Sequence, residues 1–212
     1  MAKKKLQKFN FEYKMATMVD EFFEYLLKGY VMVDCDISIT VEVFSALKGR
    51  QNESDLIRHT YAMFLCAGKG CNANEEKAVA IYQELADKGF ALSINALGAC
   101  YGVGTGVEKD CEKAFNLYEK ASALGSATAN YNLAIVYLSG NDYAPKNEKT
   151  ALKYLKKAVE QKYAYAYTLM GKCYLKGLGV ATNLTQAKAY FKLGASSGDY
   201  KAEWFLERYF NK

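Results

Sequence analysis

Alternating glycines are the first feature of this sequence that suggests a chemical site. Gly102, Gly104 and Gly106 precede Asp110 in the segment YGVGTGVEKD. Backbone N–H groups of a glycine-rich loop can cradle a phosphate. A nucleotide site of this kind also needs a preceding strand and a Gly-Lys-Ser/Thr or dinucleotide fingerprint, and it has one copy per site. The sequence has no preceding strand and neither fingerprint, and the glycine pattern occurs in three copies along the chain. We therefore interpret the glycines as turn residues.

Two weaker patterns suggest catalysis. Ser45 and Lys48 form the S-x-x-K pattern of penicillin-recognising enzymes, but the K-T-G partner is incomplete because Lys149 and Thr150 are followed by alanine. His59 is the single histidine, and nothing in the sequence identifies a nucleophile or an orienting acid for it. We therefore predict no catalytic residues and no enzyme activity.

The six cysteines are candidates for metal ligands or for disulfide bonds. They lie at positions 35, 66, 71, 100, 111 and 173, and no C-x-x-C pair occurs. These spacings match no zinc or thioredoxin signature. Most fall within helical patterns, where a free thiol packs as a small apolar group. We expect reduced, structural cysteines and no metal or cofactor, while a haem- or metal-binding module that uses the cysteines and His59 remains an alternative.

Composition and charge restrict the class of protein. The chain has 212 residues, of which 51% are apolar and 14% aromatic, as in a folded protein. Four charges of the net +5 come from Lys3, Lys4, Lys5 and Lys8, so the rest of the chain is nearly neutral. Nucleic-acid-binding domains carry a basic face, and a membrane span needs ~18 apolar residues. We expect a cytoplasmic protein with no secretory signal, no nucleic-acid partner and no membrane insertion.

The glycines belong to a unit that recurs along the chain. Three copies are LCAGKGCNANEEKAVAIYQELA, YGVGTGVEKDCEKAFNLYEKAS and YLKGLGVATNLTQAKAYFKLGA. They share two glycines, a polar residue four positions after the second glycine, an alanine and an aromatic residue, and the first two copies are 36 residues apart. A less regular copy lies between the last two; it loses the second glycine and has Pro145 in an enlarged loop.

Each unit is predicted to form two helices. Apolar residues around Leu97 recur at spacings of three and four, which places them on one helical face. The first glycine of each pair suits a helix C-terminus, where a left-handed residue ends the helix, and the second permits a tight reversal. The polar residue that follows is predicted to cap the second helix. The predicted caps are Asn74, Asp110, Asn147 and Asn183.

The segment from Leu97 to Ala121 resembles the Sel-one-like (Sel1-like) repeat, a relative of the tetratricopeptide repeat. It carries almost completely the spacing Leu-Gly-x2-Tyr-x2-Gly-x-Gly-Val-x2-Asp-x2-Lys-Ala-x3-Tyr-x2-Ala. The resemblance covers residues 53–212. It implies an all-α fold, a right-handed superhelical α/α solenoid of antiparallel helix pairs. It also implies a non-catalytic scaffold or adaptor for protein–protein interaction.

The resemblance divides the chain into repeats of a single solenoid domain. We expect a disordered basic N-terminus, a degenerate N-terminal capping repeat, four repeats and a C-terminal capping helix. Their bounds are 1–9, 10–52, 53–90, 91–126, 127–163, 164–199 and 200–212. The segment SITVEVFSALKG is expected to be the second helix of the N-terminal repeat.

A partner is expected on the side of each first helix that faces away from its second helix, since this side lines the concave surface of a solenoid. With about 100° per residue, the row consists of Leu56, His59, Met63, Leu92, Asn95, Tyr131, Ile135, Tyr165, Lys172, Trp204 and Arg208. Most of these residues are apolar or aromatic, as at protein interfaces. The alternative is that some of them pack laterally against neighbouring first helices.

The expected partners are proteins or peptide segments, and the chain is expected to be a monomer or a weak homo-oligomer. Two alternatives share the fold: a bacterial effector or toxin-immunity protein, and a haem- or metal-binding assembly factor. Thermal stabilisation by a partner would favour the scaffold. Visible or metal absorbance in the purified protein would favour the ligand-binding alternative.

Overall fold

The computed structural model describes residues 37–210, and the regular elements in this range are α-helices. The basic tail and the expected first helix of the N-terminal repeat lie outside these residues. None of the helices within 37–210 has the length and apolarity needed to cross a bilayer. The helices are α2 (Ile37–Arg50), α3 (Asp55–Ala67), α4 (Glu75–Asp87), α5 (Ala91–Val103), α6 (Cys111–Ala123), α7 (Ala127–Ser139), α8 (Glu148–Glu160), α9 (Ala164–Lys176), α10 (Leu184–Ser196) and α11 (Tyr200–Phe210).

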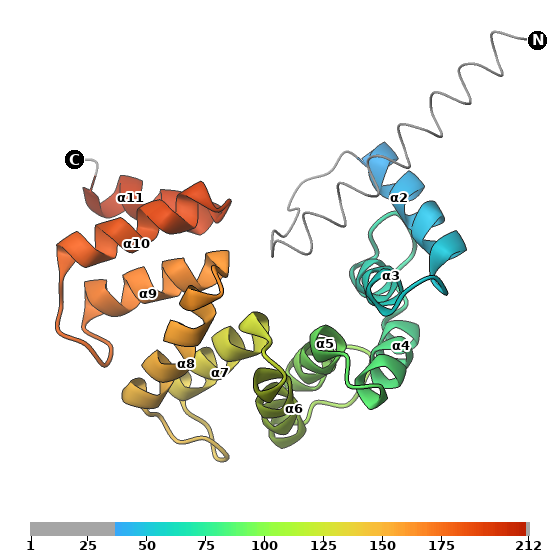
Figure 1. Cartoon of the computed structure of the whole chain (residues 1–212), viewed down its shortest axis with the longest axis horizontal. Coiled ribbons are helices and arrows are strands. Elements are labelled where there is room, and N and C mark those ends of the chain that lie inside the picture. Colours follow the sequence, from blue (N-terminus) through green and yellow to red (C-terminus); the bar gives the residue numbers. More distant parts are fainter. Residues whose placement is uncertain (1–36, 211–212) are drawn as a thin grey trace, which may run out of the picture. The chain divides into compact units, whose positions relative to one another are not determined.

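The chain divides into two compact units within α4, since the first unit ends at Tyr82 and the second begins at Gln83. The described part of the first unit contains α2, on the segment expected to be helical, together with α3 and the start of α4. In the second unit, α5 packs on α6, α7 on α8 and α9 on α10, and α11 packs on α10 (Figure 1). The second unit is thus a series of helix pairs, as in an all-α repeat solenoid.

The second helices begin, and most first helices end, as the sequence predicts. The four predicted caps accept hydrogen bonds from backbone N–H groups three residues ahead, at 2.8–3.0 Å. Helices α3, α5 and α9 end at the left-handed glycines Gly68, Gly104 and Gly177. Gly140, at the end of α7, combines a φ of 75° with a ψ of 148°, because the enlarged loop leaves this helix in another direction. Gly104 and Gly106 of the opening motif are therefore confirmed as turn residues, whereas Gly102 lies within α5.

Each pair of the second unit joins a small residue of the first helix to a large residue of the second. The pairs are Gly98 with Tyr118, Ala134 with Leu155 and Gly171 with Phe191. A Cβ atom at Gly171 would lie 2.7 Å from Cε1 of Phe191, closer than two carbon atoms can approach. Where alanine replaces the glycine, at Ala134, leucine replaces the aromatic ring, so the two helices still pack closely.

Side-chain hydrogen bonds join successive helix pairs. The Nδ2 atom of Asn132 in α7 donates to Oδ1 of Asn95 in α5 at 2.9 Å. Gln161 follows α8, and its Nε2 atom donates to the carbonyl oxygen of Gly125 at 2.7 Å. Its Oε1 atom accepts from Nδ2 of Asn130 at 3.2 Å. The Asn132–Asn95 and Gln161–Gly125 bonds join residues 127–163 to residues 91–126, whereas the Asn130–Gln161 bond lies within residues 127–163 and holds Gln161 in place.

Candidate partner-binding face

In the first unit, the predicted contact residues on α3 are largely covered. His59 is 6% exposed, and the centroid of its ring lies 5.4 Å from that of Tyr82 on α4. Burial lowers the pKa of His59 to about 4, so the imidazole is neutral at pH 7. Leu56 and Met63 are half-buried. Sequence reasoning placed His59 on a face open to a partner, but the packing against α4 makes it a core residue.

In the second unit, the predicted row on α5 and α7 is divided between lateral packing and exposure. Asn95 is 8% exposed, and its side chain is bound to Asn132 on the neighbouring first helix. Lateral packing therefore accounts for Asn95, as the alternative interpretation expected. Leu92 on α5 and Ile135 on α7 are exposed, at 39% and 38%. These two side chains offer apolar surface to solvent.

Three tyrosines form a cluster where α7 meets the start of α9. The ring centroid of Tyr131 lies 5.4 Å from that of Tyr163 and 6.3 Å from that of Tyr165. The centroids of Tyr163 and Tyr165 are 5.5 Å apart. Burial raises the pKa of Tyr131 and of Tyr163, so both phenols stay protonated. Tyr131 and Tyr165 belong to the predicted row, but Tyr163 does not, because this residue precedes α9 and lies outside its helical periodicity.

A buried carboxylate lies beside the tyrosine cluster. Asp199, directly before α11, is 2% exposed, and its Oδ1 atom accepts a hydrogen bond from the backbone N–H of Lys201 at 3.0 Å. Burial is the main cause of the raised pKa of Tyr131 and Tyr165, and the charge of Asp199 is the next. Asp199 is not among the predicted caps, although an aspartate one position before a helix is a capping signal. This carboxylate anchors the start of α11.

Three basic side chains on α9 and α11 and an exposed tryptophan on α11 lie along the last part of the predicted row. The Nζ atom of Lys172 lies 5.0 Å from the ring centroid of Phe205, and burial, followed by repulsion from Lys201, lowers the pKa of Lys172. Trp204 is 52% exposed and meets the ring of Phe205 edge-on, at 4.9 Å between centroids. Lys201 and Arg208 are exposed on the same side of α11 as Trp204. We call Lys172, Lys201, Trp204 and Arg208 the basic–aromatic row.

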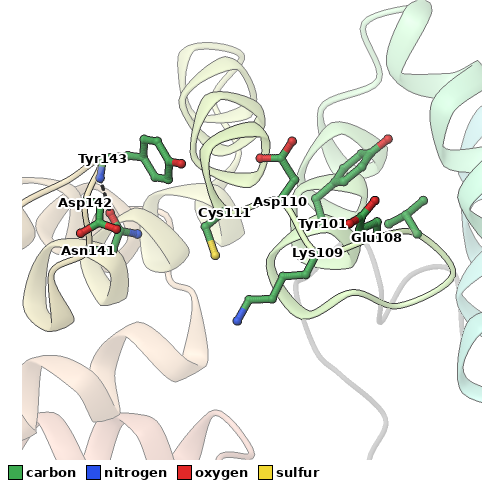
Figure 2. Close-up of a pocket in the computed structure, with 9 residues that line it drawn as sticks. Tyr101, Glu108, Lys109, Asp110, Cys111, Asn141, Asp142 and Tyr143 are labelled. Atoms are coloured by element: carbon green, nitrogen blue, oxygen red, sulfur yellow. Dashed lines mark hydrogen bonds between the residues drawn. The ribbon is translucent and has the colours of Figure 1, made fainter.

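A cavity of about 780 Å³ lies between the α5–α6 loop and the α7–α8 loop, and Figure 2 shows these loops facing each other across it. It is lined by Tyr101, Val107, Glu108, Lys109, Asp110, Cys111, Asn141, Asp142 and Tyr143. None of the predicted contact residues lines it. Within residues 37–210, no three His, Cys, Asp or Glu side chains are grouped so that they could hold a metal ion. The cavity is a polar hollow between the turns of two repeats.

The structure also locates the serine, lysine and cysteine candidates from the sequence. Ser45 and Lys48 are exposed on α2. Cys71, Cys111 and Cys173 are free thiols. Cys173 is fully buried, and burial raises its pKa to about 11. A thiol that is protonated and covered is chemically inert, which agrees with a structural role for this cysteine.

The sequence is similar to proteins that contain Sel1 repeats. The model of the Sel1 repeat family matches residues 61–90, 91–126, 127–163 and 164–199. An F-box protein of Arabidopsis thaliana is 35% identical over 113 residues, which are 53% of this chain and 30% of that protein. Cytochrome c oxidase assembly factor 7A of Xenopus laevis is 31% identical over 128 residues, which are 58% of this chain and 54% of that protein. The chain thus spans less than two thirds of the length of either relative.

Two solved structures share the fold. A Sel1 repeat protein from Oxalobacter formigenes superposes with a TM-score of 0.67 at 22% identity, over 90% of this chain and 74% of that one. A protective antigen of uropathogenic Escherichia coli superposes with a TM-score of 0.60 at 20% identity, over 79% of this chain and 37% of that one. Sel1 repeat proteins are generally scaffolds for protein interaction. Since the family model matches most of its length, this chain belongs to the Sel1 repeat family.

Proposed function

We propose that this chain is a non-catalytic scaffold that holds a protein or peptide segment against the first helices of its second unit. The observation that carries the proposal is the exposure of Ile135 and Trp204 on the predicted row, at 38% and 52%. Large apolar side chains of this kind are frequent anchors at protein interfaces. Both come from first helices, which leaves the second helices free to build the solenoid.

The packing beneath these anchors also supports the proposal. Tyr131 and Tyr165 belong to a cluster of rings in mutual contact, so they have little rotational freedom to lose when a partner binds. The contact set therefore consists of exposed and half-buried residues of the second unit, with Tyr131 as support. Its members are Leu92, Ile135, Tyr165, Lys172, Trp204 and Arg208. The buried side chains of His59 and Asn95 are left out of this set.

Site-specific cross-linking tests the proposal. A photoreactive phenylalanine analogue is introduced singly at Ile135 and Trp204, and at Tyr143 and Leu184 as controls. The control positions are at least as exposed as the test positions, at 52% and 60%, but they lie in the α7–α8 loop and at the start of α10. In a lysate of the cells that naturally make the protein, we expect one cross-linked partner at Ile135 and Trp204 that is absent at the controls.

A paired loss-of-binding experiment confirms the assignment. Ile135→Ser with Trp204→Ser removes the apolar anchors, whereas Tyr143→Ser with Leu184→Ser removes comparable surface elsewhere. The first variant should lose the partner identified by cross-linking, and the second should retain it, with circular dichroism showing that both remain helical. Equal cross-linking at all four positions, or equal retention by the two variants, would contradict a contact on the first helices.

A further inference from the structure

We propose that the basic–aromatic row of α9 and α11 binds an acidic peptide segment that carries a large apolar side chain. This inference rests on the proposed function and adds the chemistry of the partner. The row combines three cations with one exposed indole ring on two adjacent first helices. Carboxylates would meet the cations, and the apolar side chain would pack on the indole.

The cations of the row lack anionic partners within the described part of the chain. The ion pairs found there join other side chains, and no described carboxylate forms one with Lys172, Lys201 or Arg208. Glu203 and Glu207 also lie on α11, but at about 100° per residue they project about 130° and about 90° away from the centre of the row. The positive charge of the row is thus available to a bound anion.

Among the described carboxylates, Asp199 is the one whose charge acts to raise the pKa of Lys172, and it is already engaged by the backbone. Its side chain is 2% exposed and accepts the backbone N–H of Lys201. A single buried carboxylate does not balance three cations. Lys172 is half-buried and close to Lys201, whose repulsion contributes to its lowered pKa. An anion placed between these two lysines would relieve their repulsion, since each would gain an opposite charge nearby.

The neighbouring first helices indicate how the segment would lie. The predicted contact residues on α5 and α7 are uncharged, and Leu92 and Ile135 are the exposed ones. The positive charge is therefore concentrated on α9 and α11. An occupant that complements this pattern has its carboxylates over α9 and α11 and an apolar side chain near Trp204 or Ile135.

Single-stranded nucleic acid carries negative charge as well and can stack on an aromatic ring. A strand of several nucleotides needs cations along its whole path. The exposed predicted contact residues on α5 and α7, Leu92 and Ile135, are aliphatic. The observations therefore favour an acidic peptide, and nucleic acid becomes an outcome of the test.

Trp204 provides a direct readout, because it is the only tryptophan of the chain. The full chain is titrated with the peptide EEDLFDEE, its charge-reversed counterpart KKKLFKKK, the apolar-deleted EEDSGDEE and an oligouridine of equal length. We expect a saturable change in Trp204 emission with EEDLFDEE and at least about tenfold weaker binding of the other three. Raising the salt from about 50 mM to about 300 mM should weaken binding of EEDLFDEE, because exposed charges are screened.

Matched variants test the charges. Lys201→Gln with Arg208→Gln removes two exposed cations of the row, and Lys149→Gln with Lys153→Gln removes two exposed cations from α8. Both variants lose the same net charge, so a non-specific effect would be equal in the two. We expect the first to bind EEDLFDEE about threefold to tenfold more weakly and the second to bind like the wild type. Lys172→Gln, measured separately, should weaken binding in the same direction.

The outcomes separate this inference from the proposed function. Equal binding of EEDLFDEE and KKKLFKKK, or equal loss in the two glutamine variants, would overturn the acidic-peptide inference. Tighter binding of oligouridine would assign the row to nucleic acid and overturn it too. In each case, cross-linking at Ile135 and Trp204 would still support a scaffold with a partner of different chemistry. Failure of the peptides together with failure of the cross-links would remove both proposals.

Discussion

The buried imidazole of His59 makes the stability of the first unit dependent on pH. Its ring packs against Tyr82, and burial holds its pKa at about 4, compared with 6.5 in an unfolded chain. Between these values the unfolded state binds more protons than the folded state. Stability is therefore fully retained above about pH 6.5 and is lost as the pH falls towards 4.

The size of this loss follows from the pKa. The fall from 6.5 to about 4 corresponds to about 3 kcal/mol of unfolding free energy, at about 1.4 kcal/mol for each pH unit. At pH 5 the unfolded imidazole is almost fully protonated while the folded one is mostly neutral. We therefore expect about 2 kcal/mol of the total to be lost at that pH.

Two measurements test this expectation. Because His59 is the single histidine, the C–H resonances of one imidazole report its titration by nuclear magnetic resonance. Hydrogen exchange of the α3 amides, measured at about pH 7.5 and about pH 5 and corrected for intrinsic exchange, gives the local opening free energy. His59→Gln is the control: it removes the titration and leaves the carboxylates unchanged, so its loss should be smaller by about 2 kcal/mol.

Two results would refute this reasoning. One is a titration midpoint near 6.5 in the folded protein, which would mean that the imidazole reaches solvent. The other is an equal pH dependence in the wild type and in His59→Gln, since the acid sensitivity would then arise from other groups.

Three further predictions concern packing, capping and thiol chemistry. Gly171→Ala should destabilise the second unit because the added methyl group would press on Phe191. Adding Phe191→Leu, as in the Ala134–Leu155 pair, should make the double variant about 1 kcal/mol more stable than the sum of the single effects. Additive effects in a double-mutant cycle measured by urea denaturation would contradict this. Asp110→Ala should cost about 1 kcal/mol in the same assay, because it removes the cap of α6, whereas Asp110→Asn should retain most of the stability. Cys173 is fully buried and should therefore resist a thiol reagent until urea unfolds the chain. Labelling is measured by mass spectrometry, and labelled Cys173 in the native protein would contradict the prediction.

The periodic features of the fold were predictable because they depend on local chemistry. Asp110 accepts the backbone N–H of Lys113 at 2.8 Å, and Gly104 is left-handed, as the sequence indicated. Capping and left-handed conformations are decided within a few residues of the chain. The same capping and glycine signals recur in successive repeats, so each repeat supports the helix bounds predicted for the others.

The contact face was only partly predictable, because a helical wheel places a side chain on a face and does not show what covers that face. His59 and Trp204 were placed on the same row, yet α4 covers the first and the second is 52% exposed. Tyr163 and Asp199 were missed since each stands one position before a helix, where helical periodicity does not apply. Their roles follow from contacts between repeats, which depend on the angle between successive helix pairs.

The hydrogen bond between Asn95 and Asn132 gives the repeats a fixed order. If residues 127–163 were deleted, the flanking repeats, 91–126 and 164–199, would keep the family spacing. Leu169 would then occupy the position of Asn132. The amide of Asn95, which is 8% exposed, would then face an aliphatic side chain, at a cost of about 1–3 kcal/mol. Repeats that share the same glycines and caps therefore differ in the residues that contact their neighbours. Exchanging them would keep the helices but leave polar groups between repeats without partners.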